Sequence, residues 1–128
     1  MAREPRILSV GQCSADHGSI SRHLASTLDA RVVGAGTAAE ALAALRAGPF
    51  DLVLVNRIGD ADGAPGLELI RSLKAAPELA AIPVMLVSNY ADAQAQAVGL
   101  GALPGFGKAE LAAPTTGERL KAVLGSRG

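Results

Sequence analysis

The chain has 128 residues, of which 49% are hydrophobic, and 12 lysines and arginines balance 12 aspartates and glutamates. This length predicts one domain, residues 1–128 with a core at about 5–125, and the balanced charge excludes the basic field that nucleic acids and anionic membranes attract. No apolar run approaches the ~20 residues of a membrane-spanning helix, the lone Cys13 has no internal disulfide partner, and no signal-peptide pattern precedes the first strand, so we expect a cytoplasmic protein.

Short apolar runs typical of strands alternate with segments of helical period from the start of the chain. Residues 6–10 predict a buried strand. The four-residue spacing of Ile20, Leu24 and Leu28 then predicts one face of a helix. Residues 11–19 between them are expected to form a long loop. This is the first strand-helix unit.

The second unit has a clear helix start. Residues 31–33 predict a short strand, and Thr37 followed three residues later by Glu40 is a capping box. In a capping box, each of the two side chains accepts a hydrogen bond from a backbone N–H group that the helix leaves free. The box therefore predicts the start of a helix that carries Leu42 and Leu45.

The next two strands are expected at the centre of a parallel sheet. Residues 51–56 and 83–88 are almost wholly apolar, as in strands that are covered on both faces. A glycine-containing loop, residues 59–65, follows the first of these runs. The helices that follow are indicated by Leu67, Ile70 and Leu73, and by the alanine-rich residues 91–100.

The last unit completes an α/β fold. Residues 103–107 predict a short fifth strand that leads to Lys108, and Thr115 with Glu118 offers another capping box. The helix after it carries Leu120, Val123 and Leu124 on one side. Five strand-helix units predict a five-stranded parallel, doubly wound sheet of the flavodoxin-like type, with ligands or switches at the carboxyl ends of the strands.

Four sequence features together resemble the receiver domains of bacterial response regulators, the CheY-like family, over nearly the whole chain. They are the strand that ends at Asn56, the helix start Gly66-Leu-Glu-Leu-Ile70, the run Ile82-Pro-Val-Met-Leu-Val-Ser88, and Gly101-Ala102 ahead of Lys108. The resemblance implies a (βα)5 fold and a role in two-component signal transduction. In such receivers, two acidic residues after the first strand hold Mg²⁺ and an aspartate at the end of the third strand accepts phosphate. A serine or threonine and a lysine complete the site.

Ser88 and Lys108 match that pattern, whereas the acidic positions do not. Gly11 and Gln12 stand in place of the acidic pair, and Asn56 stands in place of the phosphate acceptor. An amide is a very poor nucleophile, and a glycine with two neutral amides does not supply the charge that a transferring phosphoryl group and Mg²⁺ require. The resemblance therefore implies a degenerate member, a pseudo-receiver, with no catalytic residues and no metal or other cofactor.

The residues that surround this degenerate site leave several alternatives open. Asp16, Asp60 and Asp62 lie in loops that are longer than is usual for the family, and they either turn inward to replace part of the missing charge or stay solvated. Lys108 either binds an anion together with Ser88 or is a partly buried structural lysine. With neutral groups as its nearest neighbours, its ammonium is expected to reach one of these three carboxylates or to turn toward solvent.

The pattern also lacks the family's switching aromatic. Gly105 occupies the usual position of that side chain, and Phe106 follows one residue later. In receivers the partner-facing surface is usually formed by the fourth helix, the fifth strand and the fifth helix. Five residues of this region form either a contact surface, for another signalling protein or for a second copy, or simply part of the core. They are Ala93, Ala97, Val98, Leu100 and Phe106.

Two classes of function follow from the sequence. The first is a stand-alone pseudo-receiver that acts by protein-protein interaction irrespective of phosphorylation. The alternative is a small-ligand or anion-binding domain that uses a remodelled pocket at the strand ends. An enzyme is not indicated, because no nucleophile with an oriented base is recognisable, and neither His17 nor His23 has a partner at metal-ligand spacing. The sequence does not name the partner or the pathway.

Overall fold

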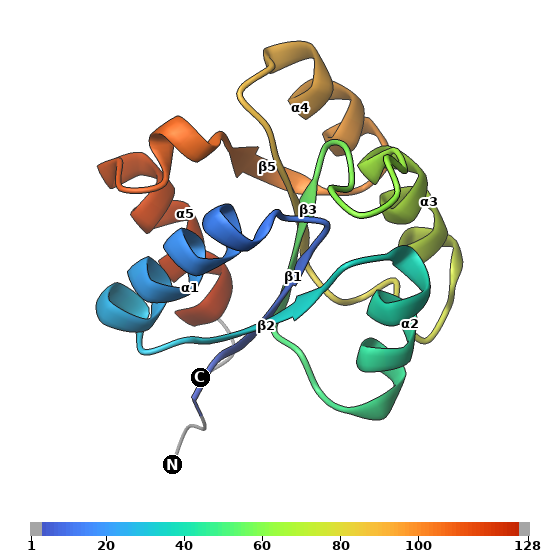
Figure 1. The fold of residues 1–128 in the computed structure, drawn as a ribbon, viewed down its shortest axis with the longest axis horizontal. Coiled ribbons are helices and arrows are strands. Elements are labelled where there is room, and N and C mark those ends of the chain that lie inside the picture. The colour runs from blue at the N-terminus through green and yellow to red at the C-terminus, as the bar shows by residue number, and fades with distance from the viewer. Residues whose placement is uncertain (1–3, 126–128) are drawn as a thin grey trace.

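The computed structural model describes residues 4–125, which form a five-stranded parallel sheet in the order β2-β1-β3-β4-β5 (Figure 1). This is the predicted flavodoxin-like fold. Every crossover connects parallel strands through a helix. The elements in chain order are β1 (Arg6–Val10), α1 (Ser14–Leu28), β2 (Arg31–Ala35), α2 (Ala38–Ala47), β3 (Leu52–Asn56), α3 (Gly66–Ala75), β4 (Val84–Val87), α4 (Ala91–Gly99), β5 (Leu103–Phe106), a 3-10 turn (Lys108–Glu110) and α5 (Pro114–Gly125).

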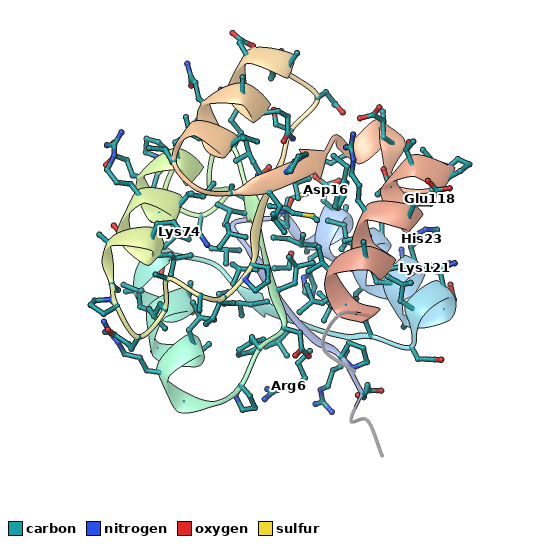
Figure 2. The ribbon with its side chains drawn as sticks, turned by 180° about the vertical axis from the view of Figure 1, so that it is seen from behind. Arg6, Asp16, His23, Lys74, Glu118 and Lys121 are labelled. Carbon is teal, nitrogen blue, oxygen red and sulfur yellow. The ribbon has the colours of Figure 1, made fainter. Side chains whose placement is uncertain are left out.

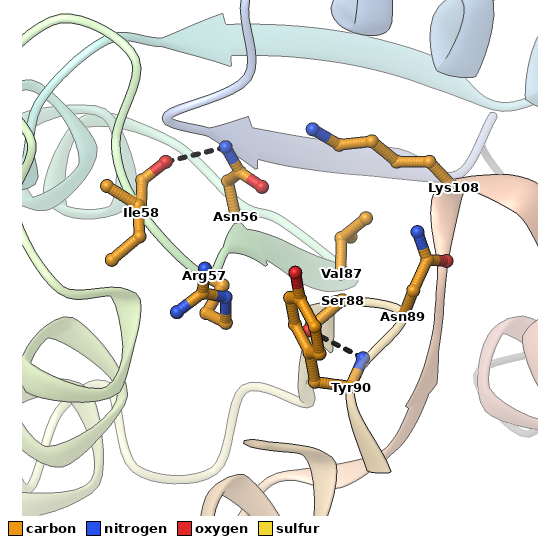
Figure 3. A pocket seen from close by; sticks show the side chains of 8 residues that line it. All are labelled: Asn56, Arg57, Ile58, Val87, Ser88, Asn89, Tyr90 and Lys108. Atoms are coloured by element: carbon orange, nitrogen blue, oxygen red, sulfur yellow. Dashed lines mark hydrogen bonds between the residues drawn. The ribbon is translucent and has the colours of Figure 1, made fainter. Parts of the chain in front are cut away.

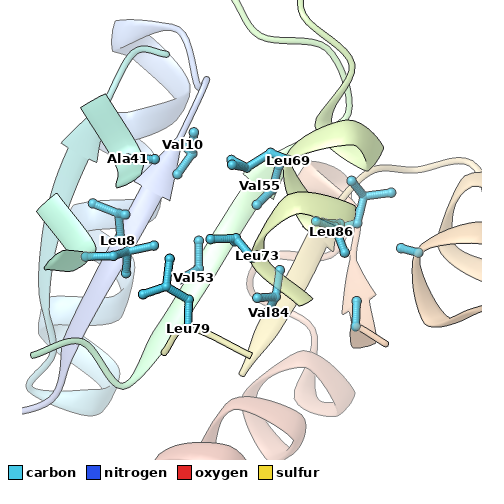
Figure 4. Packing of buried hydrophobic residues seen from close by; sticks show 14 of the residues in the cluster. Leu8, Val10, Ala41, Val53, Val55, Leu69, Leu73, Leu79, Val84 and Leu86 are labelled. Atoms are coloured by element: carbon cyan, nitrogen blue, oxygen red, sulfur yellow. The ribbon is translucent and has the colours of Figure 1, made fainter. Parts of the chain in front are cut away.

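The sheet separates two aliphatic cores, because successive side chains of a strand point to opposite faces. On β3, Val53 and Val55 pack with α2, α3 and α4, whereas Leu52 and Leu54 pack with α1 and α5 (Figures 1 and 4). All four are at most 1% exposed. This two-sided burial explains why β3 and β4 are nearly continuous apolar runs in the sequence.

The capping box at the start of α2 is confirmed. The backbone N–H of Glu40 donates to Thr37 Oγ1 at 3.2 Å, and the backbone N–H of Thr37 donates to Glu40 Oε1 at 3.1 Å. Leu45 is buried and Leu42 packs at the edge of the same core. No helix in residues 4–125 is long and apolar enough to cross a membrane.

Two expected helix starts are wrong. The segment 11–19 is not a long loop, because α1 begins at Ser14, directly after the extended backbone of Cys13. Asp16 in the first turn of α1 favours the helix by interacting with its positive end, whereas Gly18 weakens the sequence signal. The last helix begins at Pro114, so Thr115 lies inside it and is not its N-cap residue. Proline suits a first helical position because its missing N–H has no partner there.

Candidate functional site

The carboxyl ends of β3, β4 and β5 surround a small polar cavity of about 240 Å³ (Figure 3). It brings together three of the residues that the sequence singled out, Asn56, Ser88 and Lys108. Gly11 joins them through a hydrogen bond with Asn56. The full lining is Asn56, Arg57, Ile58, Val87, Ser88, Asn89, Tyr90 and Lys108.

The carboxamide of Asn56 is already engaged by the backbone. Its Nδ2 donates to the carbonyl oxygen of Gly11 at 3.1 Å and to that of Ile58 at 2.7 Å. A carbonyl oxygen is purely an acceptor, so the atom between the two is the amide nitrogen and both of its hydrogens are used. The side chain thus has a structural role at the carboxyl end of β3.

Neither position of the acidic pair offers a carboxylate. Gly11 is buried and has a φ of 77°, and a Cβ added there would lie 3.1 Å from the Cα of Gly59. The close approach of the two backbones explains the glycine. The side-chain amide of Gln12 is buried and has no hydrogen-bond partner within residues 4–125.

Lys108 forms an ion pair with Asp16, with Nζ 2.7 Å from Oδ2. The Cys13 thiol also donates to this carboxylate, at 3.3 Å. The hydrogen bond from Lys108, followed by that from Cys13, lowers the pKa of Asp16 below its ordinary value. Asp16 reaches the site from the first turn of α1, at the end of the sheet opposite Arg6 (Figure 2).

The other two candidate carboxylates do not replace the missing charge. Asp60 and Asp62 are both exposed, and Asp62 Oδ1 accepts a hydrogen bond from the backbone N–H of Ala64 at 3.0 Å, which closes a local turn. Within residues 4–125, no group of three or more His, Cys, Asp or Glu side chains is arranged to hold a metal ion.

The sequence did not single out two residues that cover the cavity. The Arg57 guanidinium carbon lies 4.8 Å from the ring centroid of Tyr90, a cation-π contact that links the segments after β3 and β4. The backbone N–H of Tyr90 donates to Ser88 Oγ at 3.1 Å. The available signal was their position, since Arg57 directly follows Asn56 and Tyr90 is two residues after Ser88, although no motif pairs an arginine with a tyrosine at this separation.

The atoms around Gly105 leave no space for a side chain. A Cβ at this position would lie 2.1 Å from the carbonyl oxygen of Leu86, and the backbone N–H of Gly105 donates to Gln94 Oε1 at 3.0 Å. Phe106 does not substitute for the absent aromatic, because it is 2% exposed and packs in the core beside α1 and α5. Position 105 therefore has no side chain, and the aromatic ring next to it in the sequence lies in the core.

No protein-family model and no curated protein sequence matches this chain. Solved structures match it closely in shape. The receiver domain of a DNA-binding response regulator from Colwellia psychrerythraea 34H has a TM-score of 0.80 and 22% identity, covering 95% of this chain and 99% of its own. The receiver domain of the Francisella response regulator 1452 has a TM-score of 0.80 and 13% identity, covering 98% and 100%.

A third solved structure, the phosphorylated cyanobacterial phytochrome response regulator RcpA, has a TM-score of 0.74 and 23% identity, covering 98% of this chain and 97% of its own. At these identities the similarity establishes the fold. The chain has the fold of a response-regulator receiver domain.

Proposed function

We propose that this protein is a pseudo-receiver, a signalling module that binds a protein partner irrespective of phosphorylation and has no catalytic activity of its own. The proposal rests mainly on the hydrogen bonds of Asn56, because both hydrogens of its side-chain amide are donated to backbone carbonyl oxygens. An amide bound in this way is not a nucleophile, and unlike a carboxylate it brings no negative charge to a metal ion. The receiver-like fold and the ion pair between Lys108 and Asp16 support the same conclusion.

The proposed contact surface is formed by α4, β5 and α5. It contains a groove of about 610 Å³ whose lining includes Gly105 from β5, Ala95 and Val98 from α4, and Arg119 from α5. Of the four large hydrophobic side chains that are exposed within residues 4–125, three lie at this surface, namely Tyr90, Val98 and Leu103 at 59%, 44% and 38%. An apolar groove with a polar rim is typical of protein interaction sites.

Three of the sequence-based candidates for this surface lie in the core, which was the alternative for them. Ala93, Ala97 and Phe106 are 8%, 0% and 2% exposed, so they belong to the core rather than to a contact surface. The helical period explains this result, because Ala93 and Ala97 share the inner face of α4. Leu100 is partly buried against the same core, and Val98 remains on the exposed side.

Affinity capture from the native host tests this proposal. Ala95→Arg places a charged side chain in the groove, and Ala43→Arg places the same side chain on the exposed surface of α2 as a matched control. We expect the wild type and Ala43→Arg to retain the same partner, and Ala95→Arg to lose it at least tenfold. Equal retention by both variants would remove the α4-β5-α5 surface from consideration. A second copy as the partner would show as a dimer in size-exclusion chromatography with light scattering.

The cavity beside Asn56 supports a second candidate function, that of a small-ligand or anion-binding domain. Lys108 and the Ser88 hydroxyl both face it (Figure 3). However, the ammonium of Lys108 is already neutralised by Asp16, which reduces its attraction for an anion. Native mass spectrometry of the purified protein distinguishes the two functions, because a retained small molecule of constant mass would favour the alternative.

A further inference from the structure

The side chain of Asn56 lies where the segments after β1 and β3 meet. Its Nδ2 joins the carbonyl oxygen of Gly11, after β1, to that of Ile58, after β3. The Gly11 oxygen also accepts the backbone N–H of Asp60 at 2.9 Å. The carbonyl oxygen of Gly11 therefore joins the end of β1 to the segment after β3 through two donors, the side-chain amide of Asn56 and the backbone N–H of Asp60.

Carbonyl oxygens are among the ligands of hard cations, and the receiver fold implies Mg²⁺ at these strand ends. The residues present do not fit that ion. Gly11 and Gln12 contribute no carboxylate, and Asp16 is held by Lys108. Between the two carbonyl oxygens there is instead a hydrogen-bond donor, the amide nitrogen of Asn56.

We propose that the Asn56 carboxamide takes the structural place of a divalent cation and holds the two segments together with its partly positive hydrogens. The arrangement of the site is then the same with and without Mg²⁺. This inference does not rest on the proposed function, because it concerns the stability of the site and requires no partner.

Two substitutions separate this role from a general contribution to packing. Asn56→Ala and Asn56→Asp both remove the side-chain amide donor, so the carbonyl oxygens of Gly11 and Ile58 each lose one hydrogen-bond partner. We expect both to lower the melting temperature in EDTA by about 5 °C or more. Asn56→Asp adds a carboxylate beside the carbonyl oxygens, so Mg²⁺ or Mn²⁺ at millimolar concentration should restore at least half of its loss, whereas Asn56→Ala should not respond.

Because charged side chains lie near Asn56, the same substitutions are also tested in a second parent protein. Lys108 and Arg57 border the cavity, and a new ion pair between the introduced carboxylate and Lys108 would mask the effect. The same variants are therefore also measured with Lys108→Met. Asn89→Asp is the matched control, because its Oδ1 accepts the backbone N–H of Ala109 and a carboxylate accepts it equally well. This control should keep its melting temperature and show no response to Mg²⁺.

Paramagnetic Mn²⁺ gives a readout that does not depend on the variants being stable. In the wild type the backbone amide signals of Gly11 and Ile58 should keep their line widths, and in Asn56→Asp they should broaden. Three results would overturn the proposal. They are unchanged stability of Asn56→Ala, no cation response of Asn56→Asp in either background, and Mn²⁺ broadening at these amides in the wild type.

Discussion

The ammonium of Lys108 lies 2.7 Å from the carboxylate of Asp16, a pair that joins the segment after β5 to the first turn of α1. The sequence predicted that Lys108 would reach Asp16, Asp60 or Asp62 or turn to solvent, and the contact with Asp16 confirms the first alternative. In a working receiver the charge of this lysine is balanced around the phosphate site. Here the carboxylate of Asp16 balances it, at neither Gly11 nor Gln12, where the sequence resemblance placed the acidic pair.

Removal of the Lys108 charge should change stability little. The side chains of Lys108 and Asp16 are 37% and 35% exposed, and ion pairs with this degree of exposure contribute less than about 1 kcal/mol because water screens them. We expect Lys108→Met, which keeps the stem, to lower the free energy of unfolding by less than about 1 kcal/mol in urea. A loss above about 2 kcal/mol would show instead that the pair is effectively buried.

The same pair predicts a dependence of stability on pH. The pKa of Asp16 is lowered in the folded protein, so its contribution is present above the unfolded value of about 3.9 and is lost as the pH falls toward the folded pKa. The difference in unfolding free energy between the wild type and Asp16→Asn should be constant from pH 7 to about pH 5 and should shrink below about pH 4. A difference that grows on acidification contradicts this sign.

Gly105 should tolerate no side chain. Gly105→Ala brings a Cβ to 2.1 Å from the Leu86 carbonyl oxygen, a backbone atom that moves only with β4, so we expect a loss of about 2 kcal/mol or more. Gly117 in α5 is the matched control, because an added Cβ meets nothing within 4 Å and alanine favours a helix by roughly 0.5–1 kcal/mol. Equal stability of the two alanine variants in chemical denaturation would contradict the steric argument.

The five strands could be predicted from the sequence because each carries a local signal. The apolar runs at β3 and β4 are long enough to identify buried parallel strands, and Thr37 with Glu40 marks the start of α2. The start of α1 was missed because Gly18 lowers helix propensity and the tertiary contact of Asp16 with Lys108 is invisible in local sequence.

The site was predicted less completely than the fold. The positions of Asn56, Ser88 and Lys108 at the cavity follow from parallel strands ending at one edge of the sheet. The cation-π contact of Arg57 with Tyr90 depends on the relative placement of two segments, which periodicity does not encode. The burial of Ala93 and Ala97 depends on which side of α4 meets the sheet, and an alanine-rich helix shows little contrast between its faces.

The domain should take up no phosphate from acetyl phosphate or a histidine kinase in the presence of Mg²⁺. The acceptor position is an amide bound to Gly11 and Ile58, and the acidic pair is missing. Intact-mass measurement should therefore show no adduct, with a functional receiver as the positive control. A stoichiometric adduct that is stable in acid and labile in base would contradict this prediction.

The same assay applied to variants tests which residues are limiting. Asn56→Asp alone should also remain without efficient labelling, since Gly11 and Gln12 still hold a metal poorly. Acidic residues at both positions are needed in addition, and Gly11→Asp must accommodate a φ of 77° and a Cβ contact of 3.1 Å with Gly59. Aspartate tolerates this backbone region better than most residues do. Efficient labelling of Asn56→Asp alone would show that the acidic pair is dispensable.

Beryllofluoride with Mg²⁺, a mimic of the phosphoryl group, should leave the α4 and β5 signals unchanged. A ligand shifts a two-state equilibrium only by its differential affinity for the states. Here there is no acceptor carboxylate to bind the mimic, and Gly105 has no side chain that rotates in response. Backbone chemical shifts of residues 91–106 should therefore be the same with and without the mimic. Saturable shifts that begin at Asn56 and Ser88 and spread through this segment would demonstrate a working switch, and the pseudo-receiver proposal would then be abandoned.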